Sequence, residues 1–105
     1  MRTQKSIIEY GIIGLGRFGF NLATALAEAG KEVMVIDKDE NKIRQIKHLV
    51  DEAFIVSSID KETLEETGIQ NCRTVIVGVS KELDISILTT LNVINMGIPR
   101  VIAKA

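Results

Sequence analysis

Residues 9–19 read EYGIIGLGRFG, in which a short apolar run leads directly into three glycines at positions 14, 16 and 19. The apolar run, bounded by glycine, predicts a β-strand over about Glu9 to Ile13. Apolar residues spaced three and four apart beyond it predict a helix from about Arg17 to Ala29, ended by Gly30. The stretch therefore predicts a strand, a glycine loop and a helix in immediate succession.

The three glycines have separate roles when such a loop joins a strand to a helix. Gly14 permits the tight turn, Gly16 lets the backbone approach a pyrophosphate, and Gly19 allows the helix to pack closely on the strand. The helix N-terminus adds a partial positive charge and free N–H groups. We therefore expect the phosphates of a nucleotide to bind here, and the alternative is a glycine-rich turn without a ligand.

Further Ile- and Val-rich runs alternate with stretches of helical period, which is the pattern of βαβ units in a parallel sheet. The predicted strands are Glu32 to Ile36, Ala53 to Val56, Thr74 to Val77 and Arg100 to Ala103. The predicted helices are one capped by Asp39, one from Lys61 to Thr67 between the cap Asp60 and the stop Gly68, and one from Glu82 to Asn95 that Gly97 and Pro99 terminate.

Right-handed crossovers give this order of elements an α/β, Rossmann-like, doubly wound parallel sheet with strand order 3-2-1-4-5, ending after strand five. Ligands of such sheets bind at the C-terminal strand ends, beside the switch between strands one and four. The loops expected at the site are residues 14–19, the end of strand two, 57–60 and 78–81.

The spacing of apolar residues predicts which helix faces are buried. These residues are Phe18, Leu22, Leu26 and Ala29 in the first helix, Ile43, Ile46 and Val50 in the second, and Leu64 in the third. In the last helix Leu83, Ile87, Leu91 and Ile94 fall within one arc, and the residues expected to point outward are Ile85, Val93 and Met96. The last helix thus has two apolar faces.

Asp37 stands at the end of the second strand, eighteen residues after Gly19. An acid at about this distance binds ribose hydroxyls in dinucleotide-binding domains. Its charge would repel a 2′-phosphate, so a nicotinamide ligand would be NAD rather than NADP, and the ribose of ATP or ADP would suit it equally. The alternative is a turn acid, since Asp39 and Glu40 are equally able to cap the next helix.

Other polar or small residues lie at the same strand ends. Arg17 offers a cation to a phosphate or to a neighbouring subunit, or is a solvated arginine at the helix start. Ser57 and Ser58 hydrogen-bond adenine or ribose, or cap the short helix. Gly78 and Ser80 flank the switch point, where a ligand needs small residues to approach, or Gly78 only ends the fourth strand.

Size and composition narrow the function classes. The 105 residues suffice for one domain, and a formal net charge of -1 gives no argument for nucleic acid or an acidic membrane surface. No apolar run approaches the roughly 20 residues of a membrane helix, and no signal-peptide pattern opens the chain, so a cytoplasmic location is expected.

His48 is expected on the second helix away from the cleft, and Cys72 as a small buried residue. The absence of a nucleophile paired with a base predicts a binding module, not an enzyme.

Four stretches resemble a known family in the same order along the chain. They are GLGRFG at 14–19, EVMVID at 32–37, TVIVGV at 74–79, and SILTTL at 86–91 running on to VIAKA at 101–105. With these stretches the sequence resembles the N-terminal subdomain of the RCK family, also called KTN, over almost its whole length. The last stretch is most similar to the peripheral subunit of Ktr and Trk potassium uptake systems.

The resemblance implies a regulatory domain on the inner face of the cell membrane that binds NAD(H) or ATP/ADP and gates an integral-membrane potassium channel or transporter. It implies that Lys104 lies near the ligand and that the arginine matching Arg17 reaches the terminal phosphate of a nucleotide in the adjacent subunit. ATP and ADP would then stabilise different dimer shapes. It also implies a longer subunit, of which this chain is one part, that forms a homo-oligomer, a dimer or an octameric ring.

Oligomerisation would account for the second apolar face of the last helix, and the alternative is scattered surface residues. Two further interpretations are the NAD-binding fragment of an oxidoreductase and the regulatory domain of a potassium efflux antiporter. The candidate ligand-binding residues are Gly14, Leu15, Gly16, Arg17, Phe18, Gly19, Asp37, Lys38, Ser57, Ser58, Gly78, Val79, Ser80 and Lys104.

Overall fold

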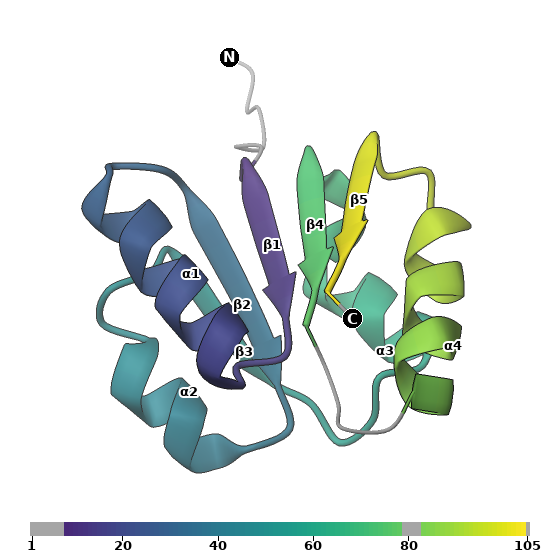
Figure 1. The fold of residues 1–105 in the computed structure, drawn as a ribbon, viewed down its shortest axis with the longest axis horizontal. Coiled ribbons are helices and arrows are strands. Elements are labelled where there is room, and N and C mark those ends of the chain that lie inside the picture. The colour runs from purple at the N-terminus through teal and green to yellow at the C-terminus, as the bar shows by residue number, and fades with distance from the viewer. Residues whose placement is uncertain (1–7, 79–82, 105) are drawn as a thin grey trace.

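The computed structural model describes residues 8–78 and 83–104, with the backbone alone for residues 83–87. They form a five-stranded sheet in the order β3-β2-β1-β4-β5 (Figure 1). Every neighbouring pair of strands is parallel. The predicted Rossmann-like topology is therefore confirmed, with the switch point between β1 and β4.

The elements alternate along the chain as predicted. The strands are β1 (Tyr10–Ile13), β2 (Val33–Asp37), β3 (Glu52–Ile55), β4 (Thr74–Val77) and β5 (Arg100–Ala103). The helices are α1 (Arg17–Glu28), α2 (Glu40–Ile46), α3 (Lys61–Thr67) and α4 (Leu83–Ile94), with a short 3₁₀ turn at Ile69–Asn71. The last helix is predicted to begin at Glu82, and this residue lies outside the described residues.

The sheet is the middle of three layers, with α1 and α2 on one side and α3 and α4 on the other (Figure 1). Alternate strand residues fill two separate cores: Ile12 and Ile76 pack with α1 and α2, whereas Ile13 and Val77 pack on the other face. Both faces of the central strands are buried, which explains why these strands read as unbroken apolar runs. The helices that cover the faces are each shorter than a membrane-spanning helix needs to be, throughout the described part of the chain.

The buried face of α1 differs from the prediction. Its fully buried residues are Gly19 and Ala23. Leu22 and Leu26 are partly buried beside them, whereas Phe18 and Ala29 are exposed. The helix α1 lies so close to the sheet that only small side chains fit between them, and the large side chains pack at the edges of the contact. The spacing of apolar residues alone does not reveal this distance.

The second helix is shorter than predicted. Ile43 and Ile46 are buried as expected, but α2 ends at Ile46. Val50 therefore lies beyond the helix, where it still packs against the core as a partly buried residue. Leu64 of α3 is buried, as predicted.

The inward and outward faces of α4 were predicted the wrong way round. Val93 is fully buried and Met96 packs against the same core. Leu91 and Ile94 are instead 51% and 52% exposed. The reason lies in Thr89, a buried polar residue one turn before Val93, which makes the sheet-facing side less apolar than the outer side. The side chains of Leu83, Ile85 and Ile87 lie outside the described residues.

Candidate functional site

The first glycine of the loop makes a turn that requires glycine. Gly14 has a φ of 99°, in the left-handed region that L side chains rarely adopt. Its N–H donates to the carbonyl oxygen of Ile36 at 2.8 Å. The start of the loop is thereby joined to the end of the neighbouring strand β2.

The other two glycines of the loop have opposite surroundings. A Cβ atom on Gly19 would overlap the carbonyl oxygen of Gly14, so any side chain there would force α1 away from the loop. A Cβ atom on Gly16 would meet nothing within 4 Å. The fold itself therefore needs glycine at position 19, whereas the space beside Gly16 is open for a group that approaches the backbone.

The N-terminus of α1 carries no side-chain cap. Gly16 occupies the N-cap position, and the first turn contains no acidic residue. The N–H groups of this turn have no carbonyl partners within the helix, and the helix dipole gives them a partial positive charge. This end of α1 is suited to an anion such as a phosphate.

Asp37 points its carboxylate at this loop. Its Oδ2 accepts a hydrogen bond from the N–H of Leu15 at 2.5 Å, and its Oδ1 accepts one from the N–H of Asp39 at 2.7 Å. Each carboxylate oxygen has a second lone pair, so both still have room for a further donor such as a ribose hydroxyl. The predicted ribose acid thus lies beside the predicted phosphate loop.

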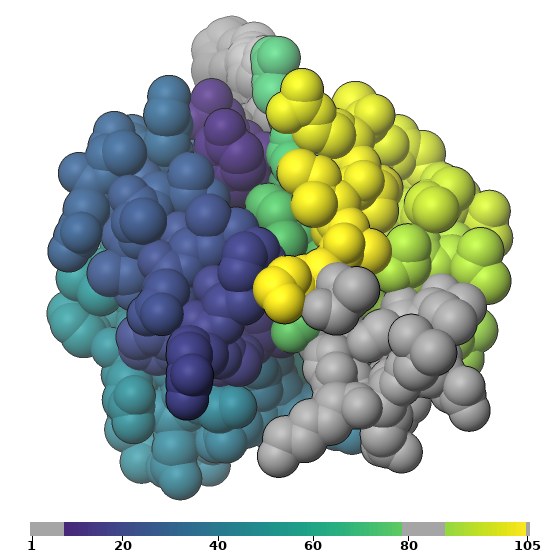
Figure 2. Space-filling model, in the orientation of Figure 1, coloured from purple at the N-terminus to yellow at the C-terminus, as the bar shows by residue number. Residues whose placement is uncertain are grey.

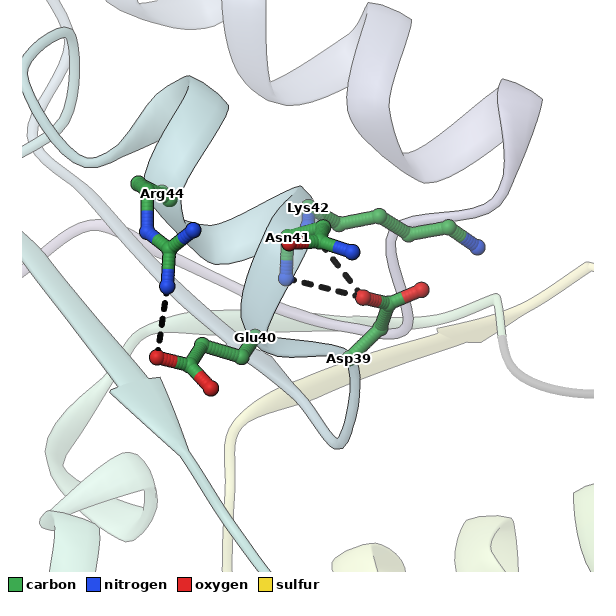
Figure 3. Close-up of polar contacts among 5 residues, drawn as sticks. All are labelled: Asp39, Glu40, Asn41, Lys42 and Arg44. Atoms are coloured by element: carbon green, nitrogen blue, oxygen red, sulfur yellow. Dashed lines mark hydrogen bonds and ion pairs between the residues drawn. The ribbon is translucent and has the colours of Figure 1, made fainter.

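A different acid caps the second helix (Figure 3). Asp39 is the N-cap of α2, and its carboxylate accepts hydrogen bonds from the N–H groups of Asn41 and Lys42. Glu40 forms an ion pair with Arg44 one turn further on, at 2.6 Å. The predicted cap is confirmed, and because Asp39 fills this role, Asp37 is not needed for it.

Arg17, Phe18 and Lys104 lie at the opening of the loop. Arg17 is the first residue of α1 and its side chain is exposed. The ring of Phe18, 39% exposed, lies 5.6 Å from the Lys104 ammonium group, a distance suited to a cation–π contact. In Figure 2 the yellow C-terminal end of the described chain lies against the dark blue start of α1. The structure thus brings the predicted Lys104 to the glycine loop.

One of the two serines after β3, Ser58, contributes to the start of α3. The hydroxyl of Ser58 donates to Asp60 at 2.5 Å, and Asp60 accepts a hydrogen bond from the N–H of Thr63 at 2.8 Å as the helix cap. The hydrogen bond from Ser58 contributes most to a lowered pKa of the Asp60 carboxyl, and the hydrogen bond from Thr63 contributes less. Ser57 and Lys38 are exposed. Ser58 thus bonds to the capping carboxylate and does not itself cap the helix, and its contact with adenine or ribose stays a prediction.

Gly78 lies where the loops after β1 and β4 meet. Its N–H donates to the carbonyl oxygen of Ile13 at 2.8 Å. A Cβ atom on it would lie 3.5 Å from the ring of Phe18 and 3.9 Å from the carbonyl oxygen of Gly14. It therefore sits at the switch point against the glycine loop. Val79 and Ser80, also expected here, lie outside the described residues.

A small cavity lies at the opposite edge of the sheet, where the strands begin. Its volume is about 190 Å³, and the residues that line it include Met34, Glu52, Asn71 and Cys72. Near Cys72, a Cβ atom on Gly11 of β1 would overlap Ile69 and come within 3.0 Å of the Cys72 sulfur, a close contact that the sequence does not predict. This cavity is remote from the glycine loop, and the candidate ligand-binding residues do not line it.

Cys72 is buried, as predicted, and its thiol is held neutral. Burial, with a smaller contribution from the charge of Glu52, raises the pKa of the thiol to about 12. Because the thiolate is the reactive form, we expect Cys72 to react with a disulfide reagent at pH 8 only as fast as the protein unfolds. Rapid labelling of the native protein, at the rate seen in denaturant, would contradict this burial.

The described residues do not form a metal centre of a familiar kind. They contain no group of three or more His, Cys, Asp or Glu side chains able to hold a metal ion. His48 is exposed and follows the end of α2, instead of lying on the helix as expected. The groups that lie at the C-terminal strand ends are N–H donors, a carboxylate and two cations, and N–H donors and cations suit an anionic ligand.

Comparisons with known proteins give this site a family context. The chain is 39% identical over 97 residues to the Ktr system potassium uptake protein C of Bacillus subtilis, and 33% identical to the Ktr system potassium uptake protein A of the same organism. Each alignment covers 92% of this chain and 44% of the relative, so the chain spans less than half the length of these proteins.

Solved structures share the fold at low sequence identity. The NAD(P)-binding domain of an exopolyphosphatase-related protein from Archaeoglobus fulgidus superposes with a TM-score of 0.78 at 20% identity, covering 93% of this chain and 73% of that one. The TrkA-N domain of the inner membrane protein ybaL from Escherichia coli gives a TM-score of 0.67 at 11% identity, covering 95% and 90% of the two chains. The model of the TrkA-N domain matches residues 10–105. Since this match includes the glycine loop, Asp37 and all five strands, the chain belongs to the TrkA-N domain family.

Proposed function

We propose that this TrkA-N domain binds NAD(H) or ATP/ADP at the glycine loop and thereby regulates potassium transport. The observation that carries the proposal is the uncapped N-terminus of α1, open beside Gly16, with the Asp37 carboxylate next to it. The N–H groups would hold the phosphates and Asp37 the ribose hydroxyls. Arg17 and Lys104 would add positive charge at the opening of the loop.

The proposed partner is an integral-membrane potassium channel or transporter, with this domain on its cytoplasmic side. The names of the Ktr relatives, which are potassium uptake proteins, support this partner. A regulatory role needs only binding, because a ligand shifts a conformational equilibrium by its differential affinity for the two states. We therefore infer a sensor of nucleotides and not an enzyme.

A thermal-shift titration with NADH, NAD, ATP, ADP and NADPH tests the proposed ligand class. A ligand that binds only the folded state at about 100 times its dissociation constant stabilises the protein by about 2.7 kcal/mol. For a domain of this size the melting temperature would then rise by roughly 10 °C. We expect a rise with NADH, ADP or ATP and a smaller one with NADPH. No rise with any of the five would contradict the proposal.

We also propose that the outer face of α4 forms contacts between copies of this domain. Leu88, Leu91 and Ile94 are each more than half exposed and lie three residues apart on one side of the helix. Adjacent exposed apolar side chains of this size are typical of protein–protein contacts. A second copy of the domain, offering the same face, is the occupant that a symmetric dimer requires.

Replacing both Leu91 and Ile94 by glutamate should therefore make the domain monomeric, because charged carboxylates resist burial against an apolar partner. Sedimentation velocity over a range of concentrations measures the change. Leu49→Glu is the matched control, since Leu49 is 42% exposed and follows α2 on the other side of the sheet. Equal sedimentation of the wild type and the double variant would rule out this face as the contact.

A further inference from the structure

The glycine loop is attached to β2 by two consecutive N–H groups. That of Gly14 donates to the backbone carbonyl of Ile36 at 2.8 Å, and that of Leu15 donates to Oδ2 of Asp37 at 2.5 Å. The first bond continues the pairing of β1 with β2, which any residue at position 36 would allow. The second depends on the side chain at position 37.

The Asp37 carboxylate is itself held in place. Its Oδ1 accepts the N–H of Asp39 at 2.7 Å, and the backbone carbonyl of Asp37 accepts the N–H of Val56 from the end of β3 at 3.1 Å. On the other side of the bond, the Leu15 side chain is 1% exposed and packs in the core under α1 and α2. A carboxylate fixed on one strand thus meets an N–H fixed by a buried side chain.

We infer that Asp37 is a positioning residue for the phosphate-binding loop, in addition to any contact with ribose. The inference rests on the proposed function, since it assumes that phosphates bind at this loop. By holding Leu15, the carboxylate sets the path of the chain just before Gly16 and the first turn of α1. The bond also occupies the N–H of Leu15, which leaves the N–H groups from α1 onward to meet the phosphates.

The two roles of Asp37 predict opposite effects on a ligand that has phosphates but no ribose. If Asp37 acts only on ribose, its removal takes a negative charge away from the phosphates and should leave binding of inorganic pyrophosphate unchanged or tighter. If it positions the loop, its removal should weaken binding of pyrophosphate in spite of the lost repulsion. Whether pyrophosphate binds more weakly or more tightly after Asp37 is removed therefore distinguishes the two roles.

The test compares wild type, Asp37→Ala and Asp37→Asn by calorimetric titration with inorganic pyrophosphate. We expect about tenfold weaker binding for Asp37→Ala, because a charge-assisted hydrogen bond to the loop is lost. Asparagine retains an oxygen that accepts from Leu15, so Asp37→Asn should bind within about threefold of the wild type. Asp39→Asn is the control for charge, since it removes a neighbouring carboxylate without touching Leu15. Binding by Asp37→Ala as tight as by the wild type would overturn the inference.

Amide hydrogen exchange of Leu15 in the ligand-free protein gives a second readout that needs no ligand. Exchange should be slow in the wild type and in Asp37→Asn and at least tenfold faster in Asp37→Ala, relative to the core amides of β1. Equally slow exchange in Asp37→Ala would overturn the inference even if pyrophosphate binds too weakly to measure. If Leu15 exchanges fast in Asp37→Ala but the wild type binds no nucleotide, the proposed function fails. The inference that Asp37 holds the loop in position is then still supported. If Asp37→Ala does not fold, Asp37→Ser takes its place in both measurements.

Discussion

Replacing Gly19 by alanine is expected to lower the melting temperature of the protein by about 10 °C and to abolish nucleotide binding. The added Cβ atom would overlap the carbonyl oxygen of Gly14, which belongs to backbone and cannot turn aside as a flexible side chain would. Overpacking of this kind costs about 2–3 kcal/mol, and relief of the clash requires α1 to move away from the loop. Thermal unfolding followed by circular dichroism measures the loss of stability.

Gly16→Ala is the matched control for this substitution. The same Cβ atom at position 16 meets nothing within 4 Å, so the melting temperature should change by no more than about 2 °C. Binding of ADP or NADH should nevertheless weaken, because the methyl group occupies space that a phosphate needs to approach the backbone. If Gly16→Ala bound nucleotides as tightly as the wild type, the open space beside Gly16 would have no part in binding.

Replacing Asp37 by alanine should raise the affinity for NADPH relative to NADH by about tenfold or more. The carboxylate next to the glycine loop would lie close to a 2′-phosphate, and like charges in contact across a binding interface cost several kcal/mol. The ratio of the two dissociation constants, measured by fluorescence titration, isolates this effect because any general weakening of phosphate binding cancels.

Asp39→Ala is the control for the ratio of the NADPH and NADH dissociation constants. Asp39 is an exposed acid two residues after Asp37, the last residue of β2, but its carboxylate is engaged in the cap of α2. Its removal should destabilise α2 by about 1 kcal/mol and leave the NADPH to NADH ratio within about threefold of the wild type. An unchanged ratio in Asp37→Ala would mean that the ribose lies elsewhere.

The sheet could be predicted from the sequence because its signals are local. Runs such as Val75-Ile76-Val77 are apolar on both faces, and the glycines and capping acids that bound the elements act within a few residues. The inward faces of the helices were harder to predict, because they depend on the distance between layers. Periodicity identifies two apolar arcs on α4, but only packing decides that the one with Thr89 and Val93 faces the sheet.

The candidate site was predictable at the level of residue types and strand ends. The positive φ of Gly14 and the clash at Gly19 agree with the roles that the G-x-G-x-x-G spacing predicts. The hydrogen bond from Leu15 to Asp37 was not foreseen, because it joins residues twenty-two positions apart through a backbone N–H that has no sequence signature. The need for Gly11 against Ile69 and Cys72 was missed for the same reason, since it arises from a contact between distant segments.

The most direct test of the central claim is a two-dimensional NMR titration of the ¹⁵N-labelled protein with ADP and with NADH. We predict that the amide signals of Gly16, Arg17 and Phe18 move furthest on addition of a saturating ligand, with those of Leu15 and Asp37 next. The amides of Gly68 and Asn71, beside the cavity at the opposite edge of the sheet, should stay in place. Shifts confined to that opposite edge, or no shifts with either ligand, would contradict the account.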